Sequence, residues 1–147
     1  MKEELYKKCE SYLEEKIARI SHSILDLESA LTNESKSSAG DKYETGREMI
    51  NIEIHKLSTQ IQEFQKLEVT LEIAKRNAAS GIVRLGSLVE ATNANYFICI
   101  PIGELSIGDK KVYVIGSNSP VAQALIGKAE GDTFNFNSIS GTIISIT

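Results

Sequence analysis

This 147-residue sequence has no Trp and only two Pro, two Cys and two His. The scarcity of Cys and His argues against a zinc site and against histidine-based catalysis. Cys9 and Cys99 lie far apart and form no CxxC or Cys/His cluster, which argues against a zinc site. We interpret both as small, buried or half-buried thiols of a reduced, cytoplasmic protein. His22 and His55 fall in helical patterns, where a histidine is usually exposed or packed, so we assign neither a catalytic role.

Long apolar runs and concentrated charge are also missing. No run of about 18 apolar residues occurs and the N-terminus is charged from Lys2 onward, so we expect neither a membrane span nor a signal peptide. The net charge of -4 at pH 7 argues against stable, independent binding of duplex DNA through its phosphates. A GxSxG motif, a P-loop and a Rossmann fingerprint are absent, which argues against a self-contained enzyme.

The first 80 residues predict two long helices, over residues 3–32 and 42–79. Their apolar residues recur every three or four positions, as in a coiled-coil seam, and no Pro interrupts them. The first stripe comprises Leu5, Cys9, Leu13, Ile17, Ile20, Ile24, Leu27 and Leu31, and the second Ile50, Ile54, Leu57, Ile61, Phe64, Leu67 and Leu71. We predict an antiparallel coiled-coil hairpin over residues 1–80, because pairing within one chain costs less loop entropy than dimerisation. A parallel coiled-coil dimer is the alternative.

The segment between these helices is rich in Ser, Lys and Gly, and we expect an acidic hairpin tip near residues 33–44. Asp41 and Glu44 stand three residues apart at its end. One interpretation is a capping box at the start of the second helix. The other is that both carboxylates face forward as part of a Mg²⁺ site, since one or two protein carboxylates often hold this ion while water and phosphate complete its shell. Spacing alone leaves both interpretations open.

After Ser80-Gly81 the pattern changes to short β-rich segments separated by turn signals, which predicts an α+β chain with a second domain over residues 81–147. The predicted strands cover residues 88–92, 96–100, 111–115, 133–137 and 142–146. A short helix is expected after residue 119, with Ser119 as N-cap, Pro120 at N1 and Gly127 as the stop. The aromatic residues that we expect to face the core of this domain are Tyr96, Tyr113, Phe134 and Phe136.

The segment from Asn118 to Asp132 reads N-S-P-V-A-Q-A-L-I-G-K-A-E-G-D. It resembles the signature S-P-[IV]-A-x-x-L-I-G-K-x-x-G-D of the Gre-type transcript cleavage factors of bacterial RNA polymerase. The layout of the whole chain is similar as well, since that family has an antiparallel coiled-coil hairpin followed by an FKBP-like domain. At the tip, Gly40, Asp41 and Glu44 match the family pattern G-D-[LIV]-x-E-N-A-E-Y, but the residues at 42 and at 45–48 depart from it.

The resemblance implies a factor that binds bacterial RNA polymerase. Its C-terminal domain would dock at the rim of the secondary channel, and its hairpin would enter that channel and meet the nascent RNA 3′ end. Asp41 and Glu44 would share Mg²⁺ with the polymerase, whose own nuclease activity cleaves backtracked RNA. No cofactor held stably by the chain alone is expected. The implied docking residues are Ser119, Pro120, Leu125, Ile126 and Gly127, with packing as the alternative role for Leu125 and Ile126.

Two other hypotheses stay open. The first is a secondary-channel regulator of the same architecture that modulates or inhibits transcription without stimulating cleavage, and the altered tip favours it more than a full family match would. A coiled-coil adaptor that shares only the C-terminal fold is the other. Prolyl isomerase activity is not predicted for the FKBP-like domain, because strand aromatics that face a core do not by themselves make an active pocket.

Overall fold

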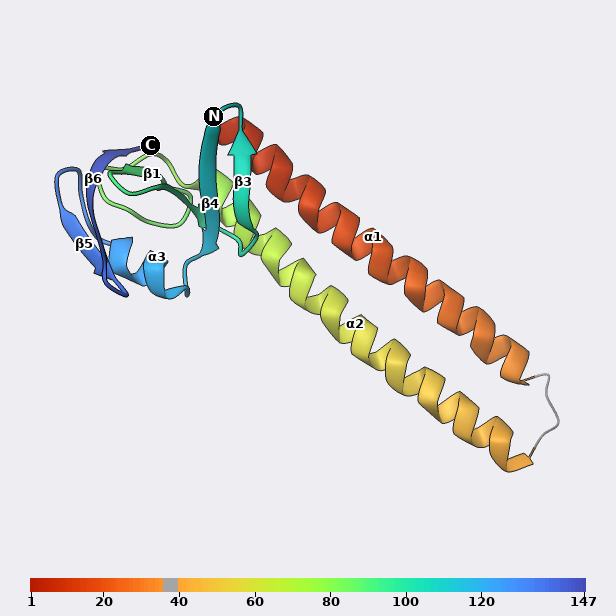
Figure 1. Cartoon of the computed structure of the whole chain (residues 1–147). Helices are drawn as coiled ribbons and strands as arrows, with labels where there is room; N and C mark the ends of the chain where they lie inside the picture. Colours follow the sequence, from red (N-terminus) through yellow and green to blue (C-terminus); the bar gives the residue numbers. More distant parts are fainter. Residues whose placement is uncertain (36–39) are drawn as a thin grey trace. The chain divides into compact units, whose positions relative to one another are not determined.

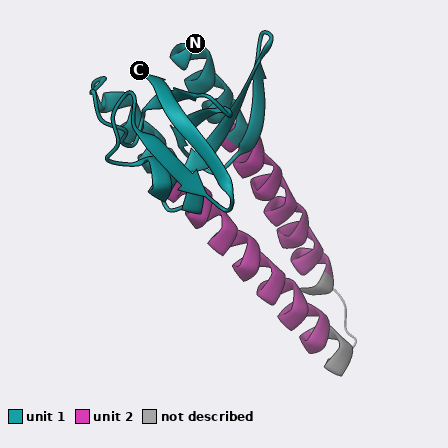
Figure 2. Ribbon diagram, turned by 60° about the vertical axis from the view of Figure 1, so that its left-hand side comes forward, with its two compact units in different colours: residues 1–12, 68–147 teal, residues 13–67 magenta. Residues whose placement is uncertain are grey.

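The computed structural model describes the backbone of residues 1–35 and 40–147 and the side chains of residues 1–33 and 44–147. Two compact units are present (Figure 2): unit 1 comprises residues 1–12 and 68–147, and unit 2 comprises residues 13–67. The long helices α1 (Lys2–Ser35) and α2 (Gly40–Arg76) each contribute to both units. Among the described residues, no helix carries an apolar stretch long enough to cross a membrane.

Unit 2 consists of the middle and distal parts of α1 and α2, which run antiparallel to each other (Figure 1). Nearly all the apolar positions of the two predicted stripes are half-buried in this unit, and Leu13 is fully buried. Apolar side chains that lie off the stripes, such as Leu25 and Ile52, are about 60% exposed (60% and 62%). The predicted helical hairpin is therefore confirmed, and the coiled-coil periodicity marks the side chains that are partly removed from water.

Unit 1 is built on a six-stranded sheet with the order β3-β4-β2-β1-β6-β5. The strands are β1 (Leu88–Ala91), β2 (Asn95–Cys99), β3 (Gly103–Ile107), β4 (Lys110–Gly116), β5 (Thr133–Phe136) and β6 (Ile139–Ile146). The pairing of β2 with β4 is parallel and the other pairings are antiparallel. One short helix, α3 (Pro120–Leu125), follows β4. The predicted α+β class, with a helical hairpin, a β-sheet domain and one short helix, is confirmed.

The sequence patterns missed β3, which pairs with β4 at the edge of the sheet. Ile107 and Lys110 face each other across the two residues Gly108 and Asp109, so these form a tight hairpin turn, and Gly108 has the positive φ of 60° that such turns require. Only Ile107 of this strand is fully buried. An edge strand with a single buried side chain lacks the strong apolar alternation on which strand prediction depends.

The two faces of the sheet are covered by different elements of unit 1. Along β2, Tyr96 and Ile98 belong to the core that α3 closes with Ala122 and Leu125. Phe97 and Cys99 point to the other face, because side chains alternate along a strand. There the Phe97 ring meets the Tyr6 ring of α1 edge to face, with centroids 5.2 Å apart. The first turns of α1 are thus part of the core of unit 1.

Candidate functional site

The predicted tip carboxylates fall at the start of α2. The side chain of Asp41 lies outside the described residues, so its role stays a prediction. Glu44 is the fifth residue of α2, which begins at Gly40, and its side chain is exposed. An exposed carboxylate close to a helix N-terminus is favoured by the helix dipole and is open to a ligand from another molecule.

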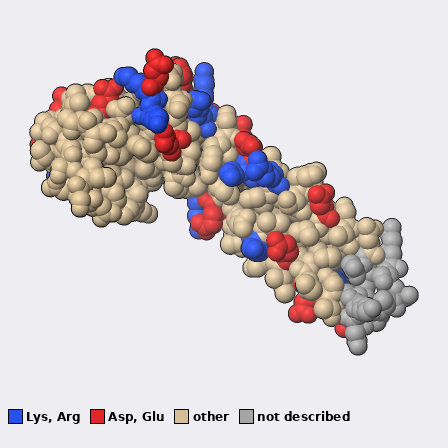
Figure 3. Space-filling view, viewed as in Figure 1, with Lys and Arg blue, Asp and Glu red and all other residues tan. Residues whose placement is uncertain are grey.

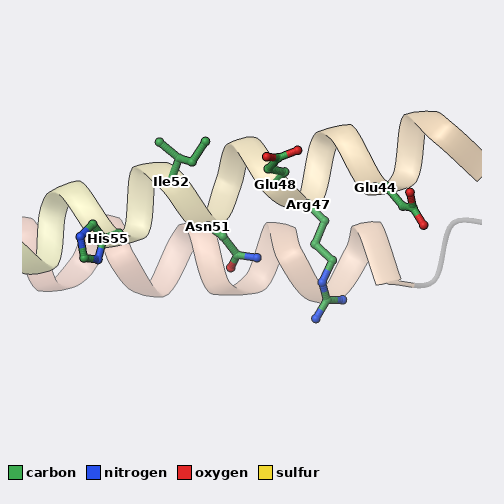
Figure 4. Close-up of a pocket in the computed structure, with 6 residues that line it drawn as sticks. All are labelled: Glu44, Arg47, Glu48, Asn51, Ile52 and His55. Carbon is green, nitrogen blue, oxygen red and sulfur yellow. The ribbon is translucent and has the colours of Figure 1, made fainter.

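A surface hollow of about 480 Å³ lies along this part of α2, and all of its lining residues come from that one helix. The lining comprises Glu44, Arg47, Glu48, Asn51, Ile52 and His55. In Figure 4, Glu44 and Arg47 leave α2 on the same side, whereas Ile52 points the opposite way. The carboxylate of Glu44 is therefore accompanied by a positive charge one turn along the helix.

The described residues contain no group of three or more His, Cys, Asp or Glu side chains that could hold a metal ion. Glu44 offers one carboxylate, and Asp41 would add a second. This donor set fits Mg²⁺ only as a shared ion, because Mg²⁺ needs octahedral oxygen ligands and keeps several from water or phosphate. The remaining ligands would have to come from a second macromolecule.

The segment that carries the family signature forms α3 and its two ends. The Ser119 Oγ accepts a hydrogen bond from the Ala122 N–H at 3.3 Å, and Pro120 occupies the start of the helix. At the other end the Ile126 N–H donates to the Ala122 carbonyl, and Gly127 follows with a φ of 89°. The predicted cap, first residue and stop of this helix are all confirmed.

The residues predicted to dock divide into an inner and an outer set. Leu125 is 0% exposed and packs in the core of unit 1, so its burial matches the alternative role in packing. Ile126 is 37% exposed, Pro120 and Gly127 are exposed, and Ser119 is half-buried. Only the outer set offers atoms that a partner can contact directly.

Sequence reasoning missed an apolar groove of about 440 Å³ beside α3. It is lined by Asn93, Ala94, Tyr96, Tyr113, Ile115, Val121, Phe136 and Ile139. Val121 belongs to the signature segment, whereas the other side chains come from the sheet and its turns. The face of unit 1 seen over β5, β6 and α3 carries few Lys, Arg, Asp or Glu side chains (Figure 3). Both features suit a contact made mainly through apolar surface.

The expectation that Tyr113 faces the core is wrong. Tyr96 and Phe134 are 7% and 2% exposed, and Phe136 is half-buried, but Tyr113 is 38% exposed. In β4 the residues on either side, Val112 and Val114, occupy the fully buried face, so alternation turns Tyr113 to the groove. Its ring lies beside that of Tyr96, with centroids 6.0 Å apart.

The Tyr96 hydroxyl is a polar group inside this groove. It accepts a hydrogen bond from the Asn93 side-chain amide at 2.9 Å. Burial raises the pKa of Tyr96, and the bond from Asn93 opposes part of that rise. The groove therefore keeps a neutral phenol next to its apolar walls at ordinary pH, and the lining residues bring no charged side chain into it.

Comparison with known proteins links the C-terminal part of this chain to one family. Residues 78–147 match the family described as transcription elongation factor, GreA/GreB, C-terminal domain. The solved GreA factor homolog 1 (Gfh1) of Thermus thermophilus is 19% identical, with 97% of this chain and 94% of that chain covered and a TM-score of 0.36. Gfh1 of Thermus aquaticus is 20% identical, with coverages of 96% and 92% and a TM-score of 0.34. No functionally curated protein matches the chain. The family match confirms the resemblance predicted from the signature segment.

Proposed function

Residues 78–147 of this chain belong to the GreA/GreB family of transcription elongation factors, and from this premise we propose that the chain is a cytoplasmic factor that binds bacterial RNA polymerase and stimulates cleavage of backtracked RNA. The family match is the observation that carries the proposal. The hairpin of α1 and α2 supports it, because a paired-helix element gives such a factor a part that enters the secondary channel.

Unit 1 makes the docking contact in this proposal. Its outer signature residues, with Ile126 the most apolar, and the groove beside α3 offer uncharged surface to the rim of the secondary channel. Apolar contact of this kind supplies affinity without the salt dependence of phosphate binding. The chain needs no basic surface for duplex DNA, because its partner surface is protein and it meets nucleic acid only at the RNA 3′ end.

The start of α2 supplies the carboxylates. Glu44, together with Asp41, would hold a Mg²⁺ ion that the polymerase also ligates. When bound, this ion lowers the pKa of the attacking water and offsets negative charge on the leaving oxygen. The contribution of the chain is to position two oxygen donors, and the nuclease activity remains that of the polymerase.

A second function is favoured by one observation, the position of Arg47. Its side chain leaves α2 on the same side as Glu44 and lines the same hollow. A positive charge beside a carboxylate competes with a metal ion for it. The chain would then occupy the secondary channel and modulate or inhibit transcription without stimulating cleavage.

The two functions are separated by a cleavage assay on backtracked transcription complexes, run beside a binding measurement. The variants are Asp41→Asn and Glu44→Gln, and the matched control is Glu48→Gln, which removes another exposed carboxylate from the same hollow. We expect the native chain and the control to stimulate cleavage, and the two tip variants to bind equally well but to lose most of the stimulation.

Binding without cleavage by the native chain would support the regulator instead. Arg47→Ala should then stimulate some cleavage where the native chain does not, since it removes the competing charge. Absence of polymerase binding by the native chain would exclude both functions. The remaining hypothesis would then be a coiled-coil adaptor that shares only the C-terminal fold.

A further inference from the structure

Unit 1 brings together the two cysteines of the chain, although 89 residues separate them in the sequence. Cys9 lies in the third turn of α1 and Cys99 ends β2. Their side chains are hydrogen-bonded to each other. Both are unpaired thiols, and they are 0% and 1% exposed. Neither thiol belongs to the residues through which we propose that the chain acts on the polymerase.

Contacts made by residues next to the two thiols hold α1 in place over β2. Tyr6, one turn before Cys9, packs edge to face on Phe97, two residues before Cys99. The Tyr6 hydroxyl also donates to the Ala74 carbonyl at 3.0 Å. Glu10, the residue after Cys9, forms an ion pair with Lys75. Contacts on both sides thus fix the position of α1 over β2, and the meeting of the two sulfurs is part of the packing.

The two thiols are chemically unequal. The hydrogen bond with Cys99 lowers the pKa of Cys9 against the effect of burial, and the positive charge of Lys75 adds to this. The hydrogen bond with Cys9, followed by burial, raises the pKa of Cys99. Within the pair the first thiolate therefore forms on Cys9, and a thiolate is the form that attacks an oxidant. The low exposure of both side chains restricts the reaction to small oxidants.

We propose that Cys9 and Cys99 form a reversible thiol–disulfide switch that fastens the first turns of α1 to the sheet of unit 1. The oxidant is a small peroxide. The Cys9 thiolate attacks one peroxide oxygen, the O–O bond breaks, and Cys9 sulfenic acid and hydroxide result. The Cys99 sulfur then attacks the Cys9 sulfur, so that the S–S bond forms and the S–O oxygen leaves as water. In total, two thiols are oxidised to a disulfide and one hydrogen peroxide is reduced to two waters. A dithiol reductant restores both thiols by exchange.

The bond would close a loop that contains most of α1 and the whole of α2, β1 and β2. Such a long cross-link reduces the conformational freedom of the unfolded chain, so the melting temperature of the oxidised protein should rise by roughly 5–15 °C. Amide hydrogens in the first turns of α1 should exchange more slowly as well, because local opening of these turns from the sheet would be blocked.

The test uses the full chain, purified with a reductant that is then removed, and treated with hydrogen peroxide. The readouts are the number of alkylatable thiols after denaturation, the intact mass, the peptide map without reduction and the melting temperature. We expect loss of both thiols in a monomer, a mass lower by two hydrogens, a 9–99 linked peptide and the rise in melting temperature, all reversed by dithiothreitol. Cys99→Ala should stop at a Cys9 sulfenic acid that dimedone traps, and Cys9→Ala should leave Cys99 unreacted.

Three results would overturn the proposal: two intact thiols at a peroxide dose that oxidises the denatured chain, disulfides between chains, or Cys9 sulfinic acid as the main product. If an alanine variant fails to fold, the peptide map of the native chain decides alone. None of these measurements requires RNA polymerase, so their outcome tests the switch independently of the proposed function.

Discussion

Tyr6, near the start of α1, donates a hydrogen bond from its hydroxyl to the backbone carbonyl of Ala74, near the end of α2, at 3.0 Å. Ala74 is among the last residues of a helix that ends at Arg76, so its carbonyl has no partner in the regular helical ladder. One side chain thus joins the two ends of the hairpin inside unit 1, while its ring packs on Phe97 of the sheet.

Tyr6→Phe should remove this hydrogen bond and keep the ring packing. We expect the free energy of unfolding to fall by about 1 kcal/mol. A larger loss is not expected, because the Ala74 carbonyl also accepts from the Asn77 N–H at 3.3 Å. Urea unfolding measures the change. Tyr113→Phe, which alters a 38% exposed tyrosine of the same unit, serves as the control and should change stability by less than about 0.5 kcal/mol.

Alkaline pH should lower the stability that Tyr6 contributes to unit 1. Burial, with smaller effects from Cys99 and Cys9, raises the pKa of Tyr6 to about 12 from its ordinary value of 10. A raised pKa means that the folded state holds the proton more tightly than the unfolded state. The resulting stability is complete below pH 10 and is lost as the pH rises from 10 through 12.

The measurement is the free energy of unfolding of the native chain and of Tyr6→Phe across that pH window. The native chain should lose stability more steeply than Tyr6→Phe, so that the difference between them shrinks toward pH 12. Parallel curves for the two chains would contradict the raised pKa.

The helices were predictable because their signal is local and repeated. Stripe positions such as Ile17 and Ile54 recur at coiled-coil spacing over many turns, and both are half-buried in unit 2. The ends of α3 were predictable for another local reason, since the cap at Ser119 and the stop at Gly127 depend only on immediate neighbours. A resemblance over Asn118–Asp132 was enough to find the family.

The groove beside α3 was not predictable, because it depends on which strands pair. Tyr113 lies beside Tyr96 only because β4 pairs with β2 in parallel, although β3 separates them in the sequence. Aromatic alternation shows that such residues share a face, but not that this part of the face is left open. The meeting of Cys9 with Cys99 has the same cause, since the packing of α1 on β2 leaves no local mark in either segment.

The signature segment places two adjacent apolar residues in different environments: Leu125 is buried and Ile126 is partly exposed. Substituting each in turn distinguishes a role in packing from a role in docking. Leu125→Ala removes a fully buried side chain from the core and should lower the free energy of unfolding by about 2–5 kcal/mol. Ile126→Ala shortens a 37% exposed side chain and should cost less than about 1 kcal/mol. Urea unfolding of the two variants under identical conditions checks the difference.

Binding to RNA polymerase should show the opposite order. At a temperature where both variants are folded, Ile126→Ala is expected to weaken binding several-fold, while Leu125→Ala keeps most of its affinity. Equal affinity of Ile126→Ala and the native chain would remove Ile126 from the docking surface and leave the contact to the groove residues.

At Gly86 the chain that enters the sheet passes close to the end of α2. Its φ is 95°, and a Cβ atom added there would lie 2.6 Å from the Ala74 carbonyl oxygen, the acceptor of the Tyr6 hydroxyl. Gly103 supplies a matched control, since its φ is 105° but an added Cβ would have no neighbouring atom within 4 Å.

Both Gly86→Ala and Gly103→Ala should incur the cost of a left-handed backbone, roughly 1–2 kcal/mol. Gly86→Ala should cost at least about 1 kcal/mol more, because a backbone carbonyl cannot rotate away from the new methyl group as a flexible side chain would. Urea unfolding of the two variants gives this difference directly. Equal losses would mean that the Ala74 carbonyl moves freely, and the hydrogen bond from Tyr6 would then be too weak to join the two helices.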